Sequence, residues 1–426
     1  MSRKIIKLLI FSIVLLFLNQ CSKPSRQEKF VLRNGLRVVF LEKDSPITSA
    51  VFCVPSGIGD GSHGIMQVTS QMLYQGTEVR TTHQFFDELA SLGGTIGSRT
   101  TLNMSYIYTQ SPEMTFEKCF ELLCECVSAP SFDNEILSRI HVGRELKVDG
   151  FFTGTHHYYD SHIRQMLFGQ STLSRQFYSK KHAFSREMIL DYYRKRFVPD
   201  NIVLVLSGRF NSRKILIRAA SMWQNLIKDD ITKKESPIPG NDADSSEKSY
   251  LTRDDYDKVW IGFRAPSFLD DFYFETRLLE KIVVSDRNNL ILKNMPESRS
   301  RIKSISSYYH SENNCGYFIV SAKTNPGEGK DIKREILRIL EELKRSDIPE
   351  DSFNIAKRKL LSETGIAQQY TLYNASLLGA IELSHEPDMT LTDFEKHLRT
   401  ISLQSIQEAA ENLFRNPVVW FSQSSQ

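Results

Sequence analysis

The sequence predicts an α+β fold of two homologous halves, each a mainly antiparallel sheet with helices packed on one face. The order of strands and helices is the same in both parts of the chain, and a polar segment separates them. A chain of 426 residues is too long for one ordinary domain, and 40% hydrophobic residues are enough to build two cores.

The first half begins with a predicted β-hairpin. The segments Phe30–Arg33 and Leu36–Leu41 flank Asn34-Gly35, a pair that favours a tight turn because both residues tolerate positive φ. A further strand is predicted at Ser49–Val54, which runs into a proline and a glycine-rich turn.

Matched landmarks indicate that the second half repeats the first. In each half one proline ends a strand, another separates a strand from an amphipathic helix, and a phenylalanine ends a helix before a strand. The corresponding residues are Pro55 and Pro266, 211 residues apart, Pro112 and Pro326, 214 apart, and Phe197 and Phe414, 217 apart. A slowly increasing offset with the same element order indicates an internal duplication.

The other elements are predicted from the spacing of their apolar residues. The predicted strands are Met104–Thr109, Ile202–Leu206, Val259–Arg264, Tyr317–Ala322 and Val418–Phe421. The predicted helices are Phe116–Val127, Ile189–Phe197, Ile332–Leu340 and Ile406–Phe414.

Composition divides the chain into five segments. Residues 1–20 are predicted as a lipoprotein signal peptide, 21–29 as a tether, 30–227 as the N-terminal half, 228–249 as a linker and 250–426 as the C-terminal half. The linker is rich in Lys, Asp, Ser, Pro and Gly and has almost no apolar residue. We therefore expect the halves to be held together by their mutual interface or by a partner subunit.

The N-terminal segment predicts export. Basic residues in Met1–Lys7 precede the apolar run Leu8–Leu18, which is too short to span a bilayer and suits a signal peptide. The following Leu18-Asn19-Gln20-Cys21 resembles a bacterial lipoprotein box, which favours lipidation of Cys21 and anchoring to the cell envelope, on its periplasmic or surface face. The alternatives are an uncleaved signal anchor, or an ordinary signal peptide with Cys21 incidental, since Gln20 is bulkier than the usual small residue.

Charge and cysteine content exclude two classes of protein. The chain has 54 basic and 51 acidic residues, and three of the bases, Arg3, Lys4 and Lys7, lie in the signal segment. The mature chain is therefore neutral, which argues against nucleic-acid binding. Six cysteines in this length do not make a disulfide scaffold, and those in the predicted helix Phe116–Val127 are interpreted as small buried hydrophobic residues.

The segment from Gly64 to Thr77, which reads GIMQVTSQMLYQGT, resembles the zinc-motif helix of the pitrilysin/insulinase metallopeptidases, a family that includes the mitochondrial processing peptidase. The resemblance extends from about Phe30 to the C-terminus. It implies a two-lobed subunit that pairs with another subunit, so that their inner faces enclose a peptide chamber. In active members it also implies an H-x-x-E-H motif, whose histidines bind zinc and whose glutamate is the general base, with a later glutamate as the third protein ligand.

In this chain the motif positions hold Gln67, Ser70 and Gln71, so both histidines and the base are replaced. Glu145 matches the later glutamate and is interpreted as a vestigial ligand, because one carboxylate does not hold zinc. His63 and His156 are candidate substitutes. His63 lacks the two partners that a zinc site would need, whereas His156 has Asp160 at helical i, i+4 spacing, and we interpret its histidine-rich segment as a polar helical surface. No catalytic residue, metal ligand or cofactor is therefore predicted, and zinc is expected only in a partner subunit.

The resemblance also implies an arginine and a tyrosine in the second half that hold the backbone of the substrate peptide. Arg287 matches the arginine, and Lys303 falls on the tyrosine position. Tyr308 or Tyr309 takes that place if the loop is shifted. The alternative for Arg287 is an ordinary surface arginine.

The favoured function is a non-catalytic member of this family. It would form a heteromer with an active zinc-peptidase homologue, bind or shape a peptide or unfolded polypeptide for it, and be attached to the membrane through Cys21. One alternative is a stand-alone surface lipoprotein that binds peptides or a protein partner. Another is an active zinc metalloendopeptidase with an unconventional site, which would contain stoichiometric zinc.

Overall fold

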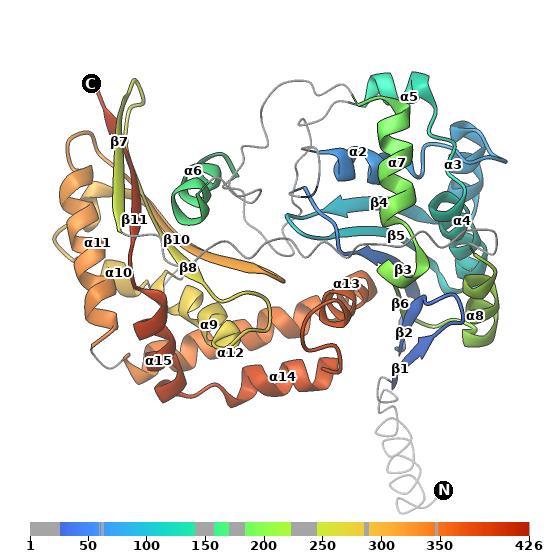
Figure 1. Ribbon diagram of the computed structural model, residues 1–426. Coiled ribbons are helices and arrows are strands. Elements are labelled where there is room, and N and C mark those ends of the chain that lie inside the picture. The colour runs from blue at the N-terminus through green and yellow to red at the C-terminus, as the bar shows by residue number, and fades with distance from the viewer. Residues whose placement is uncertain are drawn as a thin grey trace, which may run out of the picture.

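The computed structural model describes residues 26–58, 60, 64–140, 157–169, 184–222, 245–284, 289–345 and 348–425. The chain forms two lobes that lie side by side, each built on one sheet, which confirms the predicted α+β class (Figure 1). Cys21, His63, Glu145, His156 and Arg287 lie outside the described residues. Within the described ranges, none of the helices combines the length and the hydropathy that crossing a membrane requires.

The first sheet has six strands in the spatial order β1-β2-β6-β3-β5-β4. Neighbouring strands are antiparallel except for β2 and β6, which are parallel. The strands are β1 (Arg26–Val31), β2 (Arg37–Glu42), β3 (Ile47–Val54), β4 (Thr95–Thr100), β5 (Ser105–Pro112) and β6 (Val203–Gly208).

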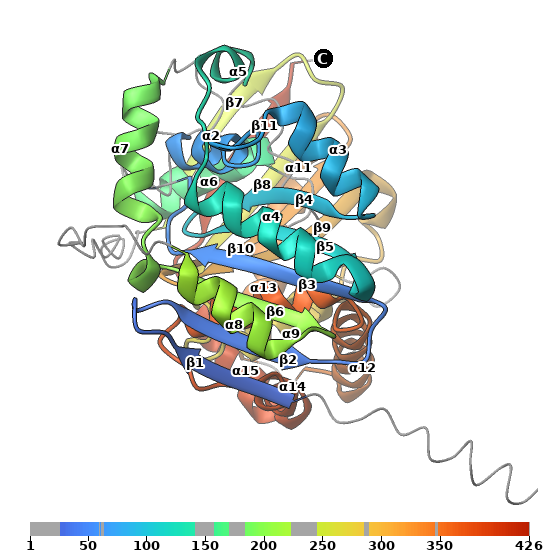
Figure 2. The same ribbon diagram turned by 90° about the vertical axis from the view of Figure 1, so that its right-hand side faces the viewer.

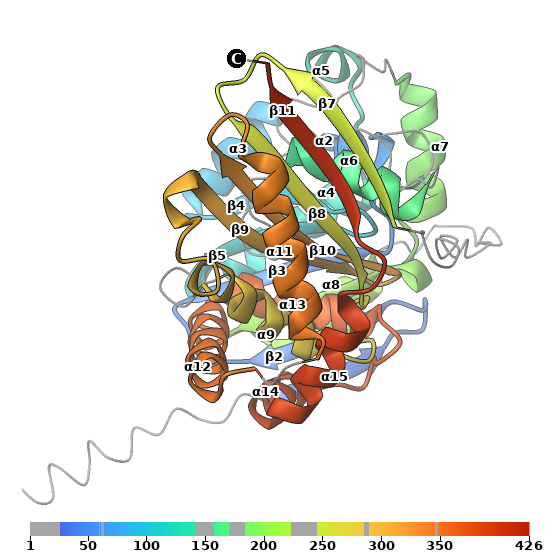
Figure 3. The ribbon, with the colours of Figure 1, turned by 90° about the vertical axis from the view of Figure 1, so that its left-hand side faces the viewer.

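The second sheet repeats this arrangement without the first strand, in the order β7-β11-β8-β10-β9. Its single parallel pair is β7 and β11, at the place of β2 and β6 (Figure 3). The strands are β7 (Ser246–Thr252), β8 (Asp257–Ala265), β9 (Ile302–Glu312), β10 (Cys315–Thr324) and β11 (Val418–Ser424). Equal strand order and equal strand directions confirm the predicted duplication.

Each sheet has one face covered by helices of its own half (Figures 2 and 3). In the first half these are α2 (Ile65–Met72), α3 (Thr82–Ser91), α4 (Phe116–Ser128), α5 (Asn134–Arg139), α7 (Arg186–Arg196) and α8 (Ser212–Ser221). In the second half they are α9 (Tyr273–Val283), α10 (Leu290–Lys293), α11 (Gly329–Leu343), α12 (Glu350–Ala367), α14 (Leu391–Thr400) and α15 (Leu403–Leu413). Side-chain caps fix several starts, for example the capping boxes of Thr81 with Gln84 and of Thr390 with Asp393.

Two helices cross to the other half. Helix α6 (His157–Phe168) belongs to the first half in sequence but packs on β8 and β11, and α13 (Thr371–Glu382) belongs to the second half but packs on β3 and β6 (Figure 1). The first residues of the two helices are 214 apart, so they are equivalent elements of the duplication. The face of each sheet that its own helices leave open is therefore covered by the partner half.

Glycines let these two crossing helices approach closely, in a reciprocal way. Cys53 on β3 and Gly262 on β8 occupy equivalent places, because each lies opposite the first residue of the neighbouring strand, Val203 and Val418. A Cβ atom on Gly262 would lie 2.3 Å from Ile163 of α6, and a Cβ on Gly379 of α13 would lie 2.1 Å from the Cys53 sulfur. Where α6 packs on β8, the glycine is on the strand (Gly262). Where α13 packs on β3, the glycine is on the helix (Gly379).

Three details differ from the sequence-based expectations. The predicted hairpin is present, but only Gly35 has positive φ (91°), and the turn is closed by Leu32 N–H to Leu36 O and Gly35 N–H to Leu32 O, both 2.9 Å. Strand β1 begins at Arg26, within the predicted tether, and β7 begins at Ser246, within the predicted linker. Both are edge strands, where polar residues are tolerated because one side of the strand stays open to water.

Replacing Gly379 by alanine is expected to destabilise the protein, because the new methyl group would collide with Cys53. Overpacking of this kind costs about 1–3 kcal/mol. The matched control is Gly365→Ala in α12, where the new methyl group would have no atom within 4 Å and a change of about 0.4–1 kcal/mol towards greater stability is expected. Chemical denaturation of both variants measures the difference, and equal stabilities would contradict the close α13 contact.

Candidate functional site

Helix α2 carries the three positions at which the sequence predicts a degenerate zinc motif. It begins after Gly64, which has φ 80° and provides no side-chain cap, and it packs against β4, β5 and α7. All of its residues are buried except Gln71, which is half-buried. Because residues four apart share a face of a helix, Gln67 and Gln71 lie one above the other.

The side chain of Ser70 is already engaged within the helix. Its hydroxyl is fully buried and donates a hydrogen bond of 2.8 Å to the carbonyl oxygen of Met66. The neighbouring Thr69 does the same with Ile65 at 2.7 Å. Such back-bonding satisfies a buried hydroxyl locally, so Ser70 is a structural part of the helix and offers no base to a water molecule.

The residues at this place do not fit a zinc ion. Zinc in proteins is held by thiolates, imidazoles and carboxylates, whereas Gln67 and Gln71 offer only neutral amide oxygens. Among the residues that the structure describes, no three His, Cys, Asp or Glu side chains are grouped closely enough to hold a metal. The described cysteines, Cys53, Cys119, Cys124, Cys126 and Cys315, are free and buried, and burial raises the pKa of their thiols.

A partly buried polar cluster that the sequence analysis missed surrounds Asp60, which precedes α2 in the chain. Asp60 accepts hydrogen bonds from Ser56, from the Tyr192 hydroxyl at 3.2 Å and from the Arg196 guanidinium at 2.8 Å. Tyr192 and Arg196 belong to α7, and burial raises the pKa of the Tyr192 hydroxyl. The cluster therefore ties Asp60 to α7, the helix that also packs directly on α2.

The hairpin tips of the two halves also meet through a buried carboxylate. Glu312, at the end of β9, accepts hydrogen bonds from the Thr101 hydroxyl at 2.9 Å and from the Leu102 N–H at 3.3 Å. His310 Nε2 lies 3.1 Å from Glu312 Oε1, and both residues are only 7% exposed. This contact joins the β4–β5 hairpin to the equivalent β9–β10 hairpin, so the two lobes have a defined relative position.

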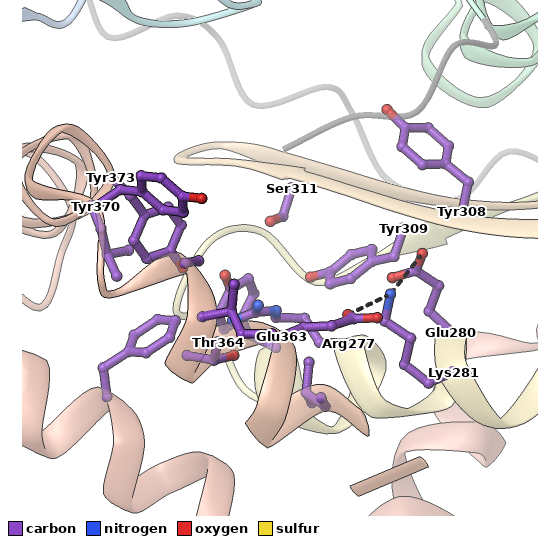
Figure 4. Close-up of a pocket in the computed structure, with 16 residues that line it drawn as sticks. Arg277, Glu280, Lys281, Tyr308, Tyr309, Ser311, Glu363, Thr364, Tyr370 and Tyr373 are labelled. Carbon is purple, nitrogen blue, oxygen red and sulfur yellow. Dashed lines mark ion pairs between the residues drawn. The ribbon is translucent and has the colours of Figure 1, made fainter. Parts of the chain in front are cut away.

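Of the residues predicted to hold a peptide in the second half, Lys303, Tyr308 and Tyr309 are on β9, while Arg287 lies outside the described residues. Lys303 is exposed on this strand, so it is in a different half from Gln67. The Tyr309 hydroxyl donates to the Pro266 carbonyl oxygen at 2.6 Å, while Tyr308 points to the other face of the strand, where it packs with Tyr317 (Figure 4). Nothing in the described residues brings Lys303 to a common cavity with α2.

Comparisons with known proteins match both halves. The family model described as insulinase (peptidase family M16) matches residues 59–174, and the model described as the peptidase M16 inactive domain matches residues 183–360. A protein of Rickettsia bellii described as an uncharacterized zinc protease is 21% identical over 368 residues, covering 82% of this chain and 85% of the relative. The uncharacterized zinc protease YmxG of Bacillus subtilis is 17% identical over 399 residues, covering 91% of this chain and 95% of the relative.

Solved structures share the two-lobed fold. A peptidase M16 inactive domain from Pseudomonas fluorescens superposes with a TM-score of 0.80 at 15% identity, covering 94% of this chain and 99% of that one. A protease from Helicobacter pylori superposes with a TM-score of 0.76 at 14% identity, with the same coverage. At these identities the similarity establishes the architecture, and the chemistry has to be judged from the residues on α2.

Replacing Asp60 by alanine is expected to lower the free energy of unfolding, because it leaves the partly buried Arg196 without a counter-charge. The two side chains are 16% and 21% exposed, so a loss of about 1–3 kcal/mol is expected, below the range for fully buried pairs. The matched control is Asp191→Ala, which removes an exposed pair with Lys195 on the same helix and should cost no more than about 0.5 kcal/mol. Similar denaturation midpoints for the two variants would contradict the structural role of the cluster.

Proposed function

Because the chain belongs to the M16 (insulinase/pitrilysin) peptidase family, we propose that it is a non-catalytic subunit that binds or shapes peptide substrate for an active zinc-peptidase partner. We also propose that it is anchored to the bacterial cell envelope through Cys21. The observation that carries the first part is the side-chain set of α2: Gln67, Ser70 and Gln71 replace both imidazole ligands and the general base.

Two features support a role in binding rather than hydrolysis. A metallopeptidase needs a water molecule that the metal and a base activate together, and α2 supplies neither a charged ligand nor a base. The helix itself is nevertheless kept, with Gly64 at its start and with its side chains packed against β4, β5 and α7. A scaffold that is maintained without the catalytic groups suits a subunit that contributes shape and substrate contacts.

A pull-down from native membranes, with zinc measured in the eluate, tests this function. A homologue that carries H-x-x-E-H is expected to co-elute with zinc, whereas the purified chain alone should contain far less than one zinc per molecule and should not cleave an unstructured peptide. As a control, a variant with Gln67→His, Ser70→Glu and Gln71→His restores the family's zinc ligands and general base on α2. This variant should bind zinc when Glu145 is intact. Adding Glu145→Gln to it should abolish the zinc binding.

The alternatives give different results in the same experiment. A stand-alone binding lipoprotein would elute without a homologue. An active peptidase with an unconventional site would contain one zinc per chain and cleave peptides in a chelator-sensitive way, with loss of cleavage on replacing His63 or His156. Either result would overturn the proposed subunit role.

The anchoring is expected to depend on Cys21 alone. A protein lacking residues 1–20 and carrying Cys21→Ser should be recovered in the soluble fraction, because the described residues contain no helix that could cross a membrane. Stable attachment requires more than one acyl chain, so mass spectrometry of the native N-terminal peptide should show a multiply acylated Cys21. An unmodified Cys21, or an intact Met1, would refute lipidation.

A further inference from the structure

The second half contains a cavity of about 490 Å³ that is separate from the α2 motif. It lies between α9, β9, α12, α13 and α14, and Figure 4 shows side chains from these elements around it. Helix α9 follows β8 as α2 follows β3, so the cavity lies against the helix that is equivalent to the motif helix of the first half. Its volume is within the range of small-ligand sites, roughly 300–1,000 Å³.

Arg277 of α9 provides a positive group in this cavity without a matching carboxylate. Its guanidinium lies 5.8 Å from the centre of the Tyr273 ring and 5.5 Å from the centre of the Phe394 ring. In the part of the chain that the structure describes, no carboxylate oxygen lies within ion-pair distance of it. Aromatic rings hold an arginine in place, but its forked N–H groups are best matched by a carboxylate.

Thr364 of α12 supplies a second group that lacks a partner. It lines the cavity and is 4% exposed, and its hydroxyl has no hydrogen-bond partner among the described residues. Buried polar atoms without a partner are rare in native proteins, because each one loses the hydrogen bond that water gave it. A ligand oxygen or N–H in the cavity would satisfy this hydroxyl.

The wall next to Arg277 contains two carboxylates, Glu280 and Glu363. Lys281 Nζ lies 3.1 Å from Glu363 Oε2 and 3.9 Å from Glu280 Oε1, and the charge of Lys359 also acts on Glu280. Glu280 is three residues after Arg277, so the two side chains project from the same face of α9. The cavity therefore has a positive and a negative end, while its total formal charge is zero.

We propose that this cavity binds a short peptide with free termini, two or three residues long, as a zwitterion. Arg277 pairs with the terminal carboxylate, the Thr364 hydroxyl hydrogen-bonds to the same end of the ligand, and the terminal ammonium lies at Glu280 and Glu363. The rings of Tyr309 and Tyr373 contact the apolar part of the ligand. A simple anion would make no use of the Glu280 and Glu363 carboxylates, and a simple cation would leave Arg277 with the Tyr273 and Tyr373 hydroxyls but without a carboxylate. This site is independent of the proposed subunit role.

Isothermal titration of the purified chain with the tripeptide Ala-Ala-Phe tests the site. Blocking the carboxylate as an amide, or the amine by acetylation, should each weaken binding by about tenfold or more, as expected for loss of a charge-assisted hydrogen bond. Arg277→Met should have the same effect as the amide. The matched control is Arg338→Met on α11, an arginine that is 53% exposed and pairs with Glu342 outside the cavity, and it should bind normally.

A second variant keeps the test decisive if Arg277→Met does not fold. Thr364→Val removes a hydroxyl that has no partner among the described residues, so it should weaken peptide binding about three- to tenfold without lowering the unfolding temperature. Equal affinity for the free and the amidated peptide, unchanged binding by Thr364→Val, or no binding of Ala-Ala-Phe at millimolar concentration would each overturn the site. None of these results bears on the zinc content of α2 or on a partner subunit.

Discussion

The exchange of α6 and α13 between the halves is the interaction on which the rest of this structure depends. A sheet has two faces, and each half has helices for only one face of its own sheet. Val39, Val51 and Val205 of the first sheet lie in the same apolar cluster as the core of the second half, and α13 joins the two. Ile163 and Leu167 of α6 pack in the same way with Trp260 and Ile319 of the second sheet. Neither half could leave the other without exposing an apolar sheet face.

The motif helix is held by packing within the first half. Helix α2 contributes apolar residues such as Met66 and Val68 to the core of that half, and it packs against β4, β5 and α7. Ser70 is satisfied internally by its bond to Met66. The fold therefore does not depend on ligands at Gln67 and Gln71, and the catalytic groups are separable from the scaffold that presents them.

The duplication also creates two equivalent places, one beside α2 and one beside α9, whose side chains have different chemistry. Beside α2 the motif positions hold neutral groups. Beside α9, Arg277 lacks a carboxylate and the Thr364 hydroxyl lacks a hydrogen-bond partner among the described residues. Burial raises the pKa of the Glu280 carboxyl, although Lys281 opposes this effect. Unsatisfied groups are costly unless a ligand meets them, and this cost at Thr364, together with the cavity beside it, is the basis of the proposed peptide site.

The sequence by itself determined most strands, the helices α4, α7, α11 and α15, the duplication and the loss of the zinc ligands, whereas β4, β7, β9 and most other helices were not predicted. The features determined in this way are local in the sequence. They follow from the alternation of apolar residues, from turn residues such as Gly35, and from the identity of Gln67, Ser70 and Gln71. None of them requires knowledge of which residues are in contact in the folded protein. Only the tertiary structure decided that α6 and α13 cross between the halves, and that Arg277 faces a cavity without an ion pair to any described carboxylate. Those properties depend on contacts between residues about a hundred or more positions apart, such as Ile163 with Gly262 and Arg277 with Phe394, and no local pattern encodes them.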